Sequence, residues 1–232
     1  RVTTDSRTTS ATPGTAVGTS DQPAAPSRLR TILVLGALVA LGPLTIDVYL
    51  PALPAITEDL GSTDAAVQFT LTGPLIGLAV GQLVIGPLSD SLGRRRPLIA
   101  GTMIHIVASL LCMIAPTVGI LGVTRALQGF GAAAAMVIAI AIVRDLFDGR
   151  AAATVMSRLV LVMGVAPIVA PSLGSLVLIH GSWRGVFAGL AVVGAALMLV
   201  AMIVIWGGLL LAVLNLRRSS GPPRPGESRR DL

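Results

Sequence analysis

The 232-residue chain contains no lysine, only one cysteine and few charged residues. Charged side chains make up 12% of the chain, about half of what a soluble domain usually carries, whereas 53% of the residues are hydrophobic. This shortage of charge excludes a large soluble domain, because too few polar side chains remain to cover its surface. The single cysteine, Cys112, lies within an apolar run, which excludes a disulfide framework and predicts a small buried side chain.

Several kinds of chemical site are missing as well. No glycine-rich loop ending in lysine is present to bind phosphates, so nothing supports direct coupling to ATP. No set of residues has the spacing of metal ligands, and no nucleophile lies beside a base, so we expect no metal site, no cofactor and no enzyme. The net charge of +6 comes from arginines that flank apolar runs, so we do not expect nucleic-acid binding.

What the chain does contain is six apolar runs, each near the roughly 20 residues with which a helix crosses a bilayer. The runs cover residues 31–55, 66–88, 97–115, 118–143, 159–180 and 185–213. A membrane-spanning segment must satisfy its own backbone groups, so the runs predict helices, and the alternating pattern of an outer-membrane barrel is absent. The sequence therefore predicts an all-α, polytopic membrane protein with a six-helix transmembrane domain over residues 30–214, in contact with the lipid bilayer.

The two ends of the chain differ in composition from this domain. Residues 1–29 are rich in Ser, Thr, Pro, Ala and Gly, and residues 215–232 are rich in arginine and proline. We expect both tails to be disordered, since neither contains enough apolar surface to fold. Fifteen of the seventeen arginines lie in the tails or in the second and fourth connections, whereas the opposite side has Arg184 and an acidic first loop. The positive-inside rule therefore predicts that both termini are cytoplasmic.

Two charged residues, Asp47 and Arg125, lie well inside predicted spans. Ionisable residues within a membrane are costly, usually face the interior of the bundle and often pair. Both lie roughly 10–12 Å below the outer surface by helical rise, so they are placed to meet across one cavity. Three hypotheses stay open for them, namely a proton-coupling pair, a static ion pair and no contact. Gln128 follows Arg125 by three residues on the same helical face, where it either lines that cavity or only packs.

A polar stretch, Gly86-Pro-Leu-Ser-Asp90-Ser-Leu-Gly93-Arg94-Arg95-Arg96-Pro97, separates the second span from the third. Gly93 supplies the backbone freedom of a tight turn, and Ser89 or Asp90 can cap the connection. Pro97 suits the first turn of the third span. A turn with a positive-inside charge would explain three arginines, but the order Gly-x-Leu-x-Asp-x-x-Gly-Arg-Arg is narrower than that requirement.

Small residues and prolines predict how the second span packs. Gly73, Gly77 and Gly81 recur every four residues, a spacing that permits close contact with a neighbouring helix in a membrane. Pro74 and Pro87 are expected to kink or soften the same span.

Taken together, several motifs resemble those of the major facilitator superfamily. The polar stretch is similar to that family's signature between its second and third helices. Arg125-Ala-Leu-Gln128-Gly129 resembles its fourth-helix motif, and Gly164-Val-Ala-Pro167-Ile-Val-Ala-Pro171-Ser-Leu-Gly174 resembles the antiporter motif of its drug exporters. Asp47-Val-Tyr49-Leu-Pro51-Ala-Leu-Pro54 and Trp183-Arg184-x-x-Phe187 are similar to the Bcr/CflA drug-resistance branch. The resemblance covers about residues 30–200.

This resemblance implies a transporter of the bacterial inner membrane that exports drugs or other small organic molecules in exchange for protons. It implies that Arg125 takes part in proton coupling. It also implies that the loop residues Gly86, Asp90, Gly93, Arg94 and Arg95 help to latch one conformation. The motif of the fifth span, at Gly164, Pro167, Pro171 and Gly174, is implied to bend its helix and to limit leakage.

Six spans correspond to one half of the twelve-helix fold of that family. The sequence leaves open a truncated or frame-shifted product, a half-transporter that pairs with itself, and a chain that joins a separate second half. A non-transporting membrane subunit and an inactive remnant are the alternatives to a transporter. A lone half is expected to expose its cavity face, with Asp47 and Arg125, to lipid or to a partner. The sequence does not indicate the substrate.

Overall fold

The computed structural model describes residues 28–207, and every regular element in that range is helical. Six helical segments there are long and apolar enough to cross a membrane. They are Leu29–Asp59, Asp64–Leu92, Arg95–Met113, Val118–Leu146, Gly149–His180 and Trp183–Gly207. The predicted all-α fold with six spans is confirmed. The predicted tail 215–232, the end of the predicted sixth span and residues 1–27 of the other predicted tail lie outside the described residues.

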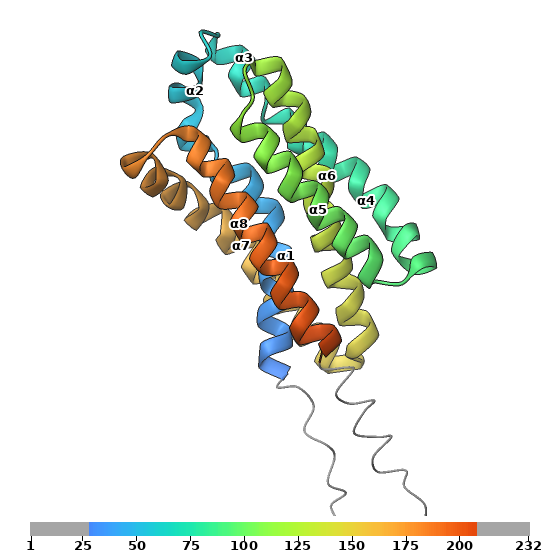
Figure 1. Cartoon of the computed structure of the whole chain (residues 1–232). Helices are drawn as coiled ribbons and strands as arrows, with labels where there is room; N and C mark the ends of the chain where they lie inside the picture. Colours follow the sequence, from blue (N-terminus) through green and yellow to red (C-terminus); the bar gives the residue numbers. More distant parts are fainter. Residues whose placement is uncertain (1–27, 208–232) are drawn as a thin grey trace, which may run out of the picture.

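Helix α6 (Val118–Leu146) lies at the centre of the bundle (Figure 1). Helices α4 (Thr72–Leu92), α5 (Arg95–Met113) and α1 (Arg28–Asp47) all pack against it. Helix α7 (Gly149–His180) packs on α1, and α8 (Trp183–Ala201) packs on α5 and continues into a π-helical turn, η2 (Met202–Gly207). A side chain on α6 can therefore contact three neighbouring helices within the core.

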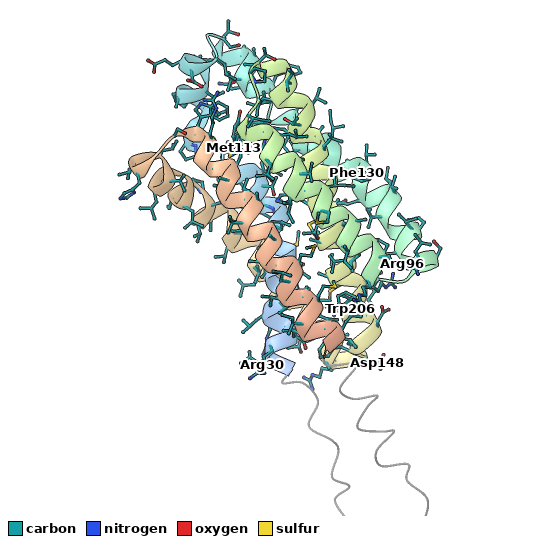
Figure 2. The ribbon with its side chains drawn as sticks, viewed as in Figure 1. Arg30, Arg96, Met113, Phe130, Asp148 and Trp206 are labelled. Atoms are coloured by element: carbon teal, nitrogen blue, oxygen red, sulfur yellow. The ribbon has the colours of Figure 1, made fainter. Side chains whose placement is uncertain are left out.

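The two ends of the bundle differ in charge. Arg30, Arg96 and Asp148 lie toward the end where α1 begins, and Met113 lies toward the opposite end (Figure 2). We call the first the basic end, because it contains Arg30 and the arginines of the connections after α4 and α6. We call the other the acidic end, because it contains the first connection with Glu58, Asp59 and Asp64.

Prolines interrupt the first two spans near the acidic end. Helix α1 ends at Asp47, and its span continues as the 3-10 turn η1 (Leu50–Ala52) and the short helix α2 (Leu53–Asp59). Pro51 and Pro54 have no N–H group, so they cannot continue the hydrogen-bond ladder of α1. In the second span, a turn before Pro74 separates α3 (Asp64–Phe69) from α4. The softening predicted at Pro74 is confirmed, whereas Pro87 lies inside α4 and does not interrupt it. The break after Asp47 is a finding of the structure.

The glycine stripe of the second span brings α4 directly onto α6. A Cβ atom added at Gly77 would overlap the carbonyl oxygen of Ala126, and one added at Gly81 would come within 2.9 Å of the carbonyl oxygen of Phe130. One added at Gly73 would lie 3.3 Å from the Cβ atom of Arg125. The predicted close contact is confirmed, and it sets the position of Arg125 relative to α4.

Two clusters of buried apolar side chains fill the bundle. The first, which we call the Tyr49 core, lies toward the acidic end and includes the broken parts of the first two spans. Its buried members are Val48, Tyr49, Ala52, Ile56, Val67, Cys112, Ala115, Leu121, Ala170, Trp183, Val186, Phe187 and Leu190. The second, which we call the alanine core, lies toward the basic end and surrounds Ala132, Ala134, Ala135 and Ala139 of α6.

Candidate functional site

Arg125 lies in the first third of α6 and is completely buried, so the expectation that a lone half exposes it is wrong. Its Nη1 donates hydrogen bonds to the carbonyl oxygen of Thr45, at 2.6 Å, and to Oε1 of Gln128, at 2.8 Å. The Nε and Nη2 atoms of Arg125 have no hydrogen-bond partner. No carboxylate among residues 28–207 forms an ion pair with Arg125. A buried positive charge without a counter-ion is costly, which makes Arg125 a candidate functional residue.

The break in the first span provides the acceptor for Arg125. The last carbonyl groups of a helix have no intrahelical partner, and α1 ends at Asp47, two residues after Thr45. The Thr45 carbonyl is therefore available to a donor from another helix. In an unbroken helix the same oxygen would accept from the N–H group of Tyr49.

Two aromatic rings lie against the Arg125 guanidinium. Its central carbon is 4.4 Å from the centre of the Tyr49 ring and 5.7 Å from the centre of the Phe187 ring. Both distances are within the range of cation–π attraction, which stabilises a positive charge in a desolvated site. The Tyr49 hydroxyl bonds Oγ1 of Thr70 at 2.8 Å, and because Thr70 donates its own proton to the Val67 carbonyl, Tyr49 is the donor.

Gln128 connects Arg125 to a second polar group on α5. Its Oε1 accepts from Arg125, and its Nε2 donates to Oγ of Ser109 at 2.8 Å. Ser109 in turn donates to the carbonyl oxygen of His105, whose Nδ1 donates to the carbonyl oxygen of Gln128 at 3.2 Å. The predicted shared face of Arg125 and Gln128 is confirmed, and this network fixes the orientation of the Gln128 amide.

Asp47 lies apart from Arg125. Its half-buried side chain lines a cavity of about 450 Å³ between α1, α4, α6 and α7. The other lining residues are Gly42, Pro43, Ile46, Leu75, Leu78, Ala79, Gln82, Met136, Met163 and Pro167. Of the three hypotheses for Asp47 and Arg125, a static ion pair is absent from this structure, because no ion pair joins them within residues 28–207. Arg125 contacts the backbone carbonyl of Thr45, whereas the Asp47 side chain, two residues further on, lines the cavity.

The polar stretch begins within the last turns of α4, which ends at Leu92, and is organised around Arg94. Its Nη1 donates to Oδ1 of Asp90 at 2.5 Å and to Oγ of Ser89 at 2.9 Å, and its Nε donates to Oδ2 of Asp145 at 2.9 Å. The hydrogen bond to Asp145, followed by the one to Asp90, raises the pKa of Arg94, so this side chain stays charged. Gly93 has a φ of 77°, which confirms the predicted tight turn.

The remaining loop residues take different positions. The Gly86 carbonyl accepts from Ser89, and Gly86 lines a cavity of about 380 Å³ with Asp90 and Arg94. Arg95 is exposed and forms no ion pair within the described part of the chain. The sequence reasoning missed Asp145. The sequence signal for it was its position beside Arg144, as an acid at an end of the fourth span that is otherwise flanked by arginines.

The motif of the fifth span lies within α7, and neither proline interrupts this helix. Pro167 lines the Asp47 cavity. Gly174 packs so tightly that an added Cβ atom would overlap the carbonyl oxygen of Val48, whereas Gly164 has open space around it. The motif therefore contacts the first span at the break after Asp47, with Pro171 between its two contact points. Over residues 28–207, no group of three or more His, Cys, Asp or Glu residues is arranged to hold a metal ion.

The sequence of this chain is similar to those of known proteins. The family model of the Major Facilitator Superfamily matches residues 33–229. The uncharacterized MFS-type transporter YdgK of Bacillus subtilis (strain 168) is 42% identical over 179 residues, which are 76% of this chain and 44% of that protein. The multidrug resistance protein MdtL of Escherichia coli O81 (strain ED1a) is 35% identical over 176 residues, which are 76% of this chain and 45% of that protein. MdtL of Shigella flexneri serotype 5b (strain 8401) matches with the same identity and coverage. The chain spans less than half the length of these relatives.

Proposed function

This chain belongs to the Major Facilitator Superfamily, and we propose that it forms one six-helix half of a proton-coupled antiporter that exports drugs or other small organic molecules. Family and fold make it a multi-pass bacterial membrane protein of a transporter family. The observation that carries the proposal is the position of Asp47, a carboxyl group inside a span that faces a cavity. The name of one relative, multidrug resistance protein, supports the substrate class.

Asp47 is the group to which we assign the transported proton. It is the one charged residue among those lining its cavity, and most of the others are apolar. An isolated carboxylate is costly against apolar walls, and either a bound proton or a polar or cationic substrate offsets that cost. Proton and substrate therefore compete for the same group, which is the requirement of antiport.

Arg125 supplies the fixed positive charge that influences the protonation of Asp47. A positive charge near a carboxyl group favours its ionised form, and moving the two apart favours proton uptake. The break at residues 48–52 follows Asp47 directly and gives the first span a place to bend. In this proposal the described conformation holds the two groups apart, and bending at the break brings them closer.

The basic end is assigned to the cytoplasm, together with both chain termini, because arginines concentrate there. The loop of Gly86, Asp90, Gly93, Arg94 and Arg95 then acts as a cytoplasmic latch. Its network with Asp145 holds the ends of α4 and α6 together, which supports such a role. The motif of the fifth span limits leakage by packing Gly174 against the break in the first span.

A second six-helix half completes the proposed transporter. Relatives of this chain are more than twice as long as the part matched here, and two halves enclose a central site in this class of transporter. A second copy of this chain or another six-helix half of the family can supply it. If the assembled chain has no transport activity, it is instead a membrane subunit or an inactive remnant.

Exchange in reconstituted vesicles tests the proposal. The chain is inserted as a dimer, and in parallel together with the second half of a twelve-helix relative. We expect a substrate gradient to move protons in the opposite direction, with loss of this coupling in Asp47→Asn and its retention in Asp47→Glu. Asp64→Asn is the matched control, because Asp64 is exposed at the acidic end. An Asp47→Asn protein that retains full coupling would overturn the assignment.

A further inference from the structure

A single carboxylate at the acidic end holds the beginning of the sixth span. Oδ2 of Asp59, the last residue of α2, accepts hydrogen bonds from Arg184 Nη1 at 2.5 Å and from Trp183 Nε1 at 3.0 Å. The guanidinium carbon of Arg184 also lies 4.3 Å from the centre of the Trp183 ring. We call these three residues the Asp59 clamp. It joins the end of the broken first span to the first turn of α8.

A continuous stack of side chains leads from the clamp to Arg125. The Trp183 and Phe187 rings meet edge to face, with centroids 6.0 Å apart and planes at 88°. Phe187 in turn meets Tyr49 at 5.6 Å and 48°, and both of these rings lie against the Arg125 guanidinium. Tyr49 and Phe187 are fully buried and Trp183 is 3% exposed. Each contact has the geometry in which aromatic pairs attract, so displacement of one ring affects the next.

The positions of the Tyr49 and Phe187 rings are important because Arg125 has few other stabilising partners. No carboxylate among the described residues pairs with its guanidinium, and two of its three nitrogens have no hydrogen-bond partner. The π faces of Tyr49 and Phe187 are therefore a main source of stabilisation for this buried charge. Phe187 follows Trp183 by one helical turn, so whatever fixes the first turn of α8 also fixes Phe187.

We propose that Asp59 is a positioning residue for Arg125. The Asp59 clamp holds the first turn of α8, and through it Phe187 and Tyr49 remain stacked on the guanidinium. The Asp59 carboxylate at the membrane surface thus controls the surroundings of the Arg125 guanidinium inside the membrane. The placement of Arg125 follows from the contacts alone; its consequence for transport rests on the proposed function.

Cys112 provides a reporter that does not depend on transport. It is the only cysteine of the chain and is fully buried in the Tyr49 core. Its Sγ donates to Oγ1 of Thr124 at 3.2 Å, and Thr124 immediately precedes Arg125. A maleimide reagent reaches this thiol only when the Tyr49 core opens, so the rate of labelling measures that opening.

The test compares labelling rates in the purified, folded full chain. We expect Asp59→Asn to accelerate labelling of Cys112 by about three- to tenfold, because an ion pair and an indole hydrogen bond weaken together. Glu58→Gln is the matched control, since Glu58 is exposed one residue earlier and no hydrogen bond of its side chain is found within residues 28–207. Asp59→Glu keeps the acceptor and is expected to restore most of the protection.

A second reporter separates local positioning from general destabilisation. Ala139→Cys in a Cys112→Ser background places the thiol in the alanine core, where Ala139 is fully buried. Asp59→Asn is expected to leave labelling there unchanged. If Asp59→Asn does not fold, Trp183→Phe serves instead, because it keeps a ring but removes the donor to Asp59. The proposal is overturned if Asp59→Asn and Glu58→Gln label Cys112 at the same rate, or if Asp59→Asn accelerates both thiols equally.

Transport measurements then address the functional consequence separately. In vesicles containing the assembled transporter, Asp59→Asn is expected to lower the maximal rate of proton-coupled exchange severalfold with little change in KM, because Asp59 does not line the Asp47 cavity. If Asp59→Asn accelerates labelling of Cys112 alone and leaves transport unchanged, the result supports the positioning of Arg125 by Asp59. The same result contradicts the role of Arg125 in proton coupling. Unchanged labelling overturns the placement whatever the transport result.

Discussion

Nε of Arg94 donates a 2.9 Å hydrogen bond to Oδ2 of Asp145, which joins two residues 51 positions apart in the chain. The same guanidinium bonds Ser89 and Asp90, so the turn after α4 is tied both to its own helix and to the end of α6. Because its acceptors raise the pKa of Arg94, the tie does not open through deprotonation of the arginine at ordinary pH. A change of pH can weaken the tie only through neutralisation of the carboxylates.

Asp145→Asn is expected to loosen this turn without unfolding the bundle. A partly exposed ion pair contributes roughly 0.2–1 kcal/mol, so we expect about a two- to fivefold rise in trypsin cleavage after Arg94 or Arg95. Mass spectrometry of the cleaved chain measures this. Asp148→Asn is the control, because Asp148 is exposed and forms no ion pair in the described part of the chain. Equal cleavage of the two variants would contradict the prediction.

Arg125→Met is expected to separate stability from function. The substitution removes a buried charge that has no described counter-ion, and apolar replacements of buried charges are often neutral or stabilising. We therefore expect unfolding in detergent at the same or a higher temperature, with proton coupling lost. Arg125→Lys keeps the charge but not the planar group over Tyr49, so it should unfold at a lower temperature than Arg125→Met. A loss of more than about 3 kcal/mol in Arg125→Met would show that the arginine is mainly structural.

Gly77→Ala tests the contact between α4 and α6. The new methyl group would overlap the Ala126 backbone, which cannot move without shifting α6, so we expect a loss of about 1–3 kcal/mol in the free energy of unfolding. Gly189→Ala in α8 is the control, because nothing lies within 4 Å of its added Cβ atom. That change should be neutral or slightly stabilising. Equal unfolding temperatures for both variants would mean that α4 and α6 do not pack as closely as described.

Gly174→Ala and Gly164→Ala divide the motif of the fifth span into two parts. A methyl group at Gly174 would overlap the carbonyl oxygen of Val48, so we expect α7 to separate from the broken first span, with a loss of about 1–3 kcal/mol. Gly164 has open space, so its alanine variant should retain wild-type stability. Thermal unfolding of the two purified variants measures the difference. A Gly164→Ala protein as unstable as Gly174→Ala would mean that the space beside Gly164 is filled in the membrane.

Local patterns in the sequence were enough to predict six spans, the tight turn at Gly93 and the glycine contact of the second span. Each depends on residues within about one helical length of one another, so composition and spacing are sufficient. The break after Asp47 was also marked locally, by Pro51 and Pro54, but two prolines do not by themselves show where a helix ends. Asp145 was overlooked because an acid near the end of a span usually has no partner.

The surroundings of Asp47 and Arg125 show what the sequence determines and what only the tertiary structure decides. The sequence by itself determined that this protein is a helical membrane protein with Asp47 and Arg125 inside its spans, because chain-local hydrophobicity decides which segments leave water. Only the tertiary structure decided that Arg125 contacts Thr45, Gln128, Tyr49 and Phe187 rather than Asp47. Depth along two helices can be counted from the sequence, but the rotation of each helix about its axis depends on packing against its neighbours. That rotation, together with the break after Asp47, directs one charge into a cavity and the other into an aromatic core.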